Sequence, residues 1–199
     1  MHVMIDLETL SLRPDAAIIQ IAAVAFEPVY LGRIPRREEA LDIRIDPHSQ
    51  ERHIDPDTLR FWKDQTEQGN TVFLDSFIGR DTVSLPRALL QFTEWWRRSG
   101  PFECVWSHGA AFDLPILIHA FMLDGYDSPP WSHRMTRDTR TLYMAMKKDN
   151  HPELWERDEL RINEFLGGKP RKHNALDDAV TQIFELQRAQ CPAGETRVQ

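Results

Sequence analysis

The chain has 199 residues, and its 31 Asp and Glu against 24 Lys and Arg give a formal net charge of −7. A hydrophobic fraction of 41% with six tryptophans excludes an intrinsically disordered chain. No apolar run approaches the roughly 18 residues of a membrane-spanning helix, which excludes an integral membrane protein. The acidic balance argues against a broad nucleic-acid-binding surface, unless bound metal ions invert the local charge.

The length and the cysteine content indicate how the chain is organised. At about 100–200 residues per domain, we expect a single domain at residues 1–191 and a flexible polar tail at 192–199. Two cysteines, Cys104 and Cys191, do not form the even, repeating set of a disulfide framework. The first residues lack the basic segment and long apolar stretch of a secretory signal peptide. We therefore expect a cytoplasmic protein.

The first part of the chain predicts three strands. A short apolar strand at 3–7 carries acidic residues at its end, and the run at 16–26 is apolar enough for a central strand. Residues 41–46 alternate between apolar and polar, as an edge strand does. Because the connections are short, an antiparallel meander is the simplest arrangement.

The rest of the chain predicts mainly helices. Helix start and stop signals delimit helices at 55–65, 84–96, 112–123, 138–146, 158–166 and 174–190. An apolar run at 103–107 predicts one further strand, and residues 66–83 are the most loop-like internal stretch. Strands first and helices later, partly interleaved, predict an α/β layered domain.

Acidic residues stand at the end of the first strand. Asp6 and Glu8 share one face of it, about 6.5–7 Å apart at the backbone, because side chains alternate along a strand. Two such carboxylates raise each other's pKa on a central strand, and a hard divalent cation such as Mg²⁺ or Mn²⁺ would relieve that cost. The alternative is an ordinary, solvated pair of surface charges.

Two further acids and a histidine accompany this pair. Asp113 begins an apolar helix, where it either stabilises the helix start or joins a site. Asn174 is a plausible N-cap, and Asp177 is explained by the helix start that it follows. Asp178 flanks the buried stripe of the last helix and would be poorly solvated without a cation, and His173 lies just before that helix.

These residues form an ordered set. Asp6-x-Glu8-Thr9, Phe112-Asp113 and His173 with Asp178 five positions later resemble the DEDDh 3′–5′ exonuclease superfamily, the DnaQ-like group, over nearly the whole chain. Residues 57–65 and 137–142 resemble its phage and bacterial subgroup, typified by a mycobacterial 3′–5′ exoribonuclease. One departure is Gly109, where many members place Asn, a change that bears on how the penultimate nucleotide is held.

The resemblance implies a fold and an activity. The fold is RNase H-like, with a mixed five-stranded sheet, three antiparallel strands first and then parallel strands, flanked by helices, and the subgroup often forms homodimers. The activity is hydrolysis from the 3′ end of single-stranded or 3′-overhang DNA or RNA, which releases nucleoside 5′-monophosphates. It uses two divalent cations, Mg²⁺ or Mn²⁺.

The resemblance also implies a role for each residue of the set. Asp6 would bridge the two cations, Glu8 and Asp178 would hold the one that carries the attacking water, and Asp113 would anchor the other. His173 would be the general base for the attacking water. Asp138 is better explained as a helix N-cap than as a fifth metal ligand.

Five residues are candidates for substrate binding. The resemblance suggests that Thr9 contacts the terminal sugar and that Leu10 packs on the terminal base, although a core position explains Leu10 equally well. Phe112 would stack on a base or belong to the core. Trp62 and Gln65, one helical turn apart, face the substrate or a dimer partner, or else are a buried tryptophan and a surface glutamine.

Several alternatives stay open at this point. The basic clusters at 33–37 and 169–172 either contact phosphates or form solvated loops. The substrate is either a general strand or a very short oligoribonucleotide. A different class of protein, a non-catalytic RNase H-like module that binds nucleic acid or a partner, would tend to lose an acid or the histidine. Here the full set is present.

Overall fold

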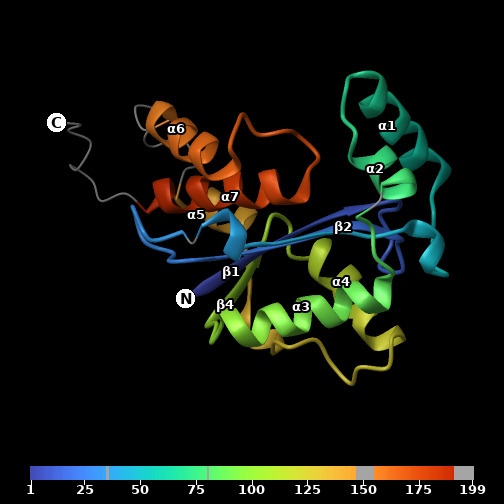
Figure 1. Ribbon diagram of the computed structural model, residues 1–199. Coiled ribbons are helices and arrows are strands. Elements are labelled where there is room, and N and C mark those ends of the chain that lie inside the picture. Colours follow the sequence, from blue (N-terminus) through green and yellow to red (C-terminus); the bar gives the residue numbers. More distant parts are fainter. Residues whose placement is uncertain (35, 80, 147–154, 191–199) are drawn as a thin grey trace.

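The computed structural model describes residues 1–34, 36–79, 81–146 and 155–190 (Figure 1). The strands are β1 His2–Thr9, β2 Ile18–Phe26, β3 Leu41–Arg44, β4 Cys104–Ser107 and β5 Thr136–Asp138. The helices are α1 Pro56–Glu67, α2 Val72–Ile78, α3 Leu85–Ser99, α4 Asp113–Leu123, α5 Thr139–Met146, α6 Trp155–Leu166 and α7 Ala175–Ala189.

The five strands form one mixed sheet in the order β3-β2-β1-β4-β5. The pairs β3–β2 and β2–β1 are antiparallel, and β1–β4 and β4–β5 are parallel. This confirms the RNase H-like arrangement, with antiparallel strands first and parallel strands after them. All nine residues of β2 are buried, as expected of a central strand without polar alternation.

Helices cover both faces of the sheet, with α3 and α4 on one face and α5, α6 and α7 on the other (Figure 1). The odd-numbered residues Val3, Ile5 and Leu7 of β1 belong to the core beneath α3 and α4. Met4 points the opposite way, into the core beneath α7. Because side chains alternate, Asp6 and Glu8 continue the Met4 face toward the start of α7.

A third, smaller core fills the end of the sheet under α1 and α2. Leu10, which directly follows β1, packs there with Ile19, Trp62 and Val72. The indole Nε1 of Trp62 donates a hydrogen bond to the carbonyl of Thr9 at 2.9 Å. This contact ties α1 to the last residue of β1 and encloses that end of the strand.

One expectation of secondary structure was wrong, since residues 66–83 are not loop throughout. Residues 66–83 contain α2, whose Val72 and Ser76 are buried and whose Phe73 and Phe77 rings pack edge to face. The three-residue strand β5, too short and polar to leave a pattern, precedes α5. Among the described residues, no helix is long and apolar enough to cross a membrane. The expected tail at 192–199 lies outside the described residues.

Candidate active site

Three carboxylates meet where β1 ends and α7 begins. Asp6 and Glu8 come from β1 and Asp178 from the first turn of α7, and one oxygen of each lies within 4.8 Å of the others. Asp6 is 8% exposed and Glu8 7% exposed, and Asp178 is half-buried. Three like charges at this distance, largely withdrawn from water, require protons or a cation between them.

The electrostatics of the cluster express this repulsion. Burial raises the pKa of Asp6 well above its usual range, and the charges of Asp113, Glu8 and Asp178 raise it further. Burial raises the pKa of Glu8 in the same way, followed by repulsion from Asp178. Burial also raises the pKa of Asp178 to about 6. Because carboxylate oxygens are the ligands that hard divalent cations prefer, this donor set fits Mg²⁺ or Mn²⁺.

Asp113 stands beside this cluster rather than within it. It is the first residue of α4 and is buried, and its Oδ1 accepts a hydrogen bond from the backbone N–H of Leu7 at 3.2 Å. Burial raises the pKa of Asp113 to about 7, although that hydrogen bond and the charge of Arg140 oppose the rise. Asp113 is therefore both a helix-start acid and a neighbour of Asp6.

The turn that leads into α4 depends on Gly109. Gly109 has φ +97°, a left-handed conformation that other residues rarely adopt. Its N–H donates to Oδ1 of Asp138 at 3.2 Å, and the N–H of Arg140 donates to the same oxygen at 3.0 Å. Asp138 therefore caps α5 and braces the turn before Asp113, a structural role that agrees with its predicted use as a cap.

His173 lies in the loop before α7, close to Asp178. Its backbone N–H donates to Oδ2 of Asp178 at 3.2 Å, and its φ of +55° is left-handed. The imidazole meets the ring of Phe61 edge to face, with centroids 4.9 Å apart, and the ring of Trp62 at 6.3 Å. Burial and then the charge of Lys172 lower the pKa of His173, which favours the neutral imidazole.

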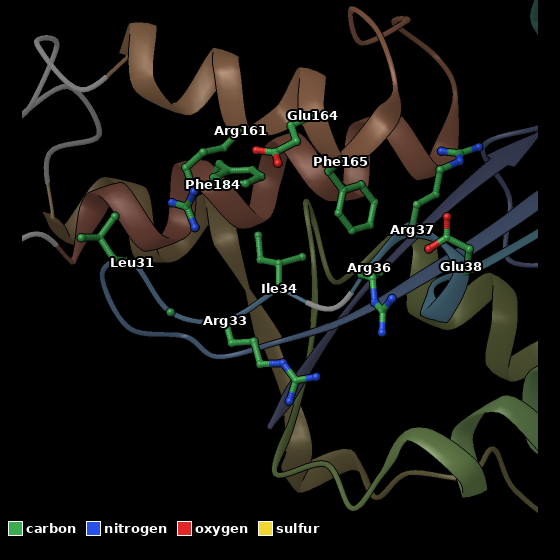
Figure 2. Close-up of a pocket in the computed structure, with 11 residues that line it drawn as sticks. Leu31, Arg33, Ile34, Arg36, Arg37, Glu38, Arg161, Glu164, Phe165 and Phe184 are labelled. Carbon is green, nitrogen blue, oxygen red and sulfur yellow. The ribbon is translucent and has the colours of Figure 1, made fainter.

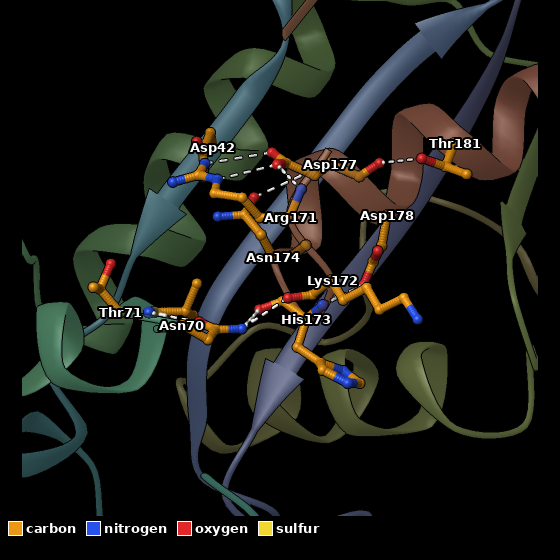
Figure 3. A network of polar contacts seen from close by, with 12 residues as sticks. Asp42, Asn70, Thr71, Arg171, Lys172, His173, Asn174, Asp177, Asp178 and Thr181 are labelled. Carbon is orange, nitrogen blue, oxygen red and sulfur yellow. Dashed lines mark hydrogen bonds and ion pairs between the residues drawn. The ribbon is translucent and has the colours of Figure 1, made fainter. Parts of the chain in front are cut away.

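A polar network holds this loop (Figure 3). Asn70, between α1 and α2, donates from Nδ2 to the carbonyls of Lys172 at 2.7 Å and His173 at 3.3 Å. Asp177 accepts hydrogen bonds from the backbone N–H and the guanidinium of Arg171. Asn174 is the N-cap of α7, as predicted, because its Oδ1 accepts from the N–H of Asp177.

A cavity of about 440 Å³ opens next to Glu8 and His173. Of the five residues expected to bind substrate, Thr9, Trp62 and Phe112 line it. Gln65 instead lines a neighbouring cavity of about 290 Å³, together with Asn70 and Lys172. Leu10 is 0% exposed in the core beside Trp62, so the core alternative, and not contact with a base, describes its position.

Four further residues lie around the site that no motif of the sequence singled out. Leu12 and Phe61 line the cavity, and the Leu12 side chain is 77% exposed. An apolar residue in the short loop after the acidic strand was the sequence signal for Leu12. Gln182 donates from Nε2 to Oδ1 of Asp6 at 2.9 Å. Its position four residues after Asp178, on the same helix face, was also a usable signal. Asn70, the fourth, left no such pattern.

Comparisons with known proteins agree with this geometry. A family model described as the 3′–5′ exoribonuclease Rv2179c-like domain matches residues 1–189. An exodeoxyribonuclease of Enterobacteria phage T4 is 27% identical, and the match covers 71% of this chain and 70% of the relative.

Solved structures share the fold at low sequence identity. Pop2p of S. pombe, in a Mg²⁺- and Mn²⁺-bound form, has a TM-score of 0.61 at 11% identity and covers 99% of this chain and 85% of its own. The nuclease domain of 3′hExo, a DEDDh family member bound to rAMP, has a TM-score of 0.54 at 15% identity, over 94% of this chain and 89% of that chain. Because the family model spans nearly the whole sequence, this chain belongs to the Rv2179c-like 3′–5′ exoribonuclease domain family and is an enzyme of the 3′–5′ exonuclease class.

Proposed function

We propose that this protein removes nucleotides one at a time from the 3′ end of a DNA or RNA strand and releases nucleoside 5′-monophosphates. The reaction depends on two divalent cations, Mg²⁺ or Mn²⁺. The observation that carries the proposal is the approach of Asp6, Glu8 and Asp178 within 4.8 Å at a largely buried strand end. Repulsion within such a carboxylate cluster lowers the stability of the fold, and a bound cation offsets that repulsion.

The four acids divide into two sets of ligands. Asp6, Glu8 and Asp178 would hold one cation, and Asp6 and Asp113 would hold the other. Two divalent cations bound there would lower the pKa of a water molecule and would offset the negative charge that develops on the phosphate oxygens. Asp113, tied to the N–H of Leu7, keeps its carboxylate beside β1 for this purpose.

His173 serves as the general base. The hydrogen bond from its backbone N–H to Asp178 holds the residue at the edge of the carboxylate cluster. A neutral imidazole accepts a proton near neutral pH, so the ring would take the proton of the attacking water. The edge-to-face contact with Phe61 limits the orientations open to the ring.

The cavity beside Glu8 receives the 3′-terminal nucleoside. Its walls are largely aromatic and apolar. The exposed ring of Phe61 and the half-buried ring of Phe112 offer surfaces on which a base can stack, while Trp62, only 2% exposed, packs against Phe61 from the core. Stacking tolerates any base, which suits an enzyme that shortens strands of varied sequence. Thr9 and the carboxylates border the polar side, where the sugar and the phosphodiester would lie.

The test uses 5′-labelled DNA and RNA strands of matched sequence, single-stranded and with a shorter complement, in Mg²⁺ and in Mn²⁺. We expect a ladder of shortened products that EDTA and the Asp6→Asn variant abolish, while Asp64→Asn, an exposed acid on α1, leaves it unchanged. Intact strands under every metal would overturn the proposal. Strand binding without hydrolysis would instead indicate the non-catalytic module.

The same digestion addresses the sugar preference. The matching family is described as exoribonuclease and the phage relative as exodeoxyribonuclease, so both sugars are proposed substrates. Recognition of the 2′-hydroxyl would appear as faster shortening of the RNA strand. A homodimer and a cytoplasmic location stay predictions, and light scattering of the purified protein tests the first.

A further inference from the structure

A larger cavity, of about 560 Å³, lies between the β2–β3 connection and α6 (Figure 2). It is lined by four arginines and two glutamates, over a floor that includes Ile34, Phe165 and Phe184. Arg33, Arg36 and Arg37 come from the connection, and Arg161 comes from α6. The lining thus carries four guanidinium groups and two carboxylates, in a chain whose net charge is −7. The carboxylates of Glu27 and Glu39 accept hydrogen bonds from the backbone N–H groups of Arg33 and Arg36, so the two guanidinium groups are not engaged by them.

The four arginines of the cavity differ in how their guanidinium groups are engaged. Arg37 pairs with Asp42 at 3.8 Å, and the guanidinium of Arg161 lies 4.5 Å from the centre of the Phe184 ring. Within the described part of the chain, no carboxylate is within ion-pair distance of the Arg33 or Arg36 guanidinium. Both side chains are exposed and so remain available to an anion from solution.

The cavity is close to the candidate active site. Strand register places Asp42 of β3 opposite Ala22 of β2, and Ala22 opposite Asp6 of β1. Asp42 and Asp6 therefore stand in one row, two strand spacings or about 10 Å apart at the backbone. Arg37, paired with Asp42, marks the side of the cavity that is nearest to the carboxylates.

Further cations continue from this point to His173. Arg171, held by Asp177, lies within electrostatic range of Asp42. Lys172 follows it, is exposed, and directly precedes His173. Arg37, paired with Asp42, and Arg171, paired with Asp177, are thus basic residues between the four-arginine cavity and Lys172, which directly precedes the proposed general base.

We propose that Arg33, Arg36, Arg37 and Arg161 form an upstream subsite for the phosphates of the substrate strand, a few nucleotides 5′ of the cleaved end. The inference rests on the proposed exonuclease function. Guanidinium groups suit the site because their planar forks match phosphate oxygens, and backbone contacts of this kind position a strand without reading its sequence. Phe165, half-buried at the wall, adds an apolar surface for a base.

A binding experiment tests the subsite without requiring turnover. The double variant Arg33→Ala/Arg36→Ala and a matched control, Arg97→Ala/Arg98→Ala, are made in the Asp6→Asn background. Arg97 and Arg98 are exposed at the end of α3, on the opposite face of the sheet. Anisotropy of a fluorescent single strand of about 15 nucleotides is measured in EDTA over a range of salt concentrations.

We expect the Arg33/Arg36 variant to bind the strand at least about 5-fold more weakly at low salt. Its plot of log affinity against log salt should be shallower by about 1.4, since each phosphate contact on a single strand contributes about 0.7. The control should keep the wild-type slope. Equal slopes for both variants would overturn the strand subsite. It would also be overturned if the difference in strand affinity between the two variants disappeared when millimolar AMP was added as a free nucleotide.

Turnover separates this inference from the proposed function. In the active protein, the Arg33/Arg36 variant should lower kcat/KM on the long strand and leave hydrolysis of a dinucleotide unchanged, since a dinucleotide does not reach the cavity. If both substrates are hydrolysed at wild-type rates, the subsite is wrong and the exonuclease function stands. If the wild type hydrolyses neither, the function fails, and the binding experiment still decides the subsite.

Discussion

The side-chain amide of Gln182 donates a hydrogen bond to Oδ1 of Asp6 at 2.9 Å, across a sequence separation of 176 residues. Gln182 lies one turn after Asp178 on α7, so one helix supplies both a carboxylate and the group that orients its partner on β1. Residues that orient a metal ligand in this way typically contribute 10- to 100-fold to metal affinity or activity.

Replacement of Gln182 by methionine should therefore weaken metal binding. Methionine keeps the length of the side chain but offers no N–H to Asp6, so the carboxylate loses its orientation. We expect the Mg²⁺ concentration for half-maximal activity to rise by about 10-fold or more. The control is Gln187→Met on the same helix, whose amide bonds the carbonyls of Glu27 and Gly32, far from the carboxylates in the fold. An equal shift in the control would contradict the role of Gln182.

Asn70 should act on turnover through the loop that carries His173. Its amide donates to the carbonyls of Lys172 and His173, and its Oδ1 accepts from the N–H of Val72. Asn70→Asp keeps the acceptor but loses the donor, so we expect kcat to fall by about 10-fold with KM little changed. The exposed Gln68→Ala serves as control. A change confined to thermal stability would show that Asn70 is only structural.

His173→Ala tests the general base directly. Loss of a positioned proton acceptor should lower kcat by about 10²- to 10⁴-fold while metal binding, measured by calorimetry, is retained. His133→Ala, an exposed histidine in the turn before β5, should behave as wild type. Loss of metal binding in His173→Ala would mean that the imidazole is a ligand and not the base.

The metal-free protein should lose stability as the pH rises. The folded-state pKa is about 7 for Asp113 and about 6 for Asp178, above the ordinary 3.8, so the folded state holds protons that the unfolded state has released. Stability therefore falls as pH rises from about 4 to about 7. In EDTA we expect Tm at about pH 8 to be at least about 5 °C below that at about pH 5.

Two changes should restore the stability of the metal-free protein at the higher pH. Mg²⁺ or Mn²⁺ should restore Tm at the higher pH, because a bound cation stabilises only the folded state. Asp6→Asn, which removes one of the repelling charges, should raise Tm in EDTA at the higher pH. A metal-free Tm that does not change with pH would show that the cluster carries no such strain.

Local patterns explain which site residues the sequence could predict. Asp6 and Glu8 share a face because a strand alternates, and His173 and Asp178 bracket one recognisable helix start. Gln182 and Asn70 act through contacts with partners 176 and 103 residues away. Helical periodicity places Gln182 on the face of Asp178, but no sequence pattern joins Gln182 to Asp6 or Asn70 to His173, so only the folded chain reveals these two contacts.

In the fold, too, elements with a local sequence pattern could be predicted, and elements that depend on distant contacts could not. β2 was recognisable because a nine-residue run with Gln20 as its one polar residue has few other structural roles, whereas β5 has three residues and pairs only with β4 among the described strands. The seven residues of α2 are too few for a clear helical pattern, and tertiary packing against α1 supports them. Leu10 was ambiguous for a related reason, since burial depends on Trp62, which lies 52 positions later.

His173 has a left-handed backbone conformation that a histidine side chain does not favour. Glycine adopts φ +55° without steric cost, whereas for a residue with a Cβ atom this conformation is less favourable by roughly 1–2 kcal/mol. Asn70 and Asp178 hold the backbone there from opposite sides. A chain selected for stability alone would place glycine at this position. The unfavourable backbone conformation at residue 173 is what we expect if the imidazole has the proposed catalytic role.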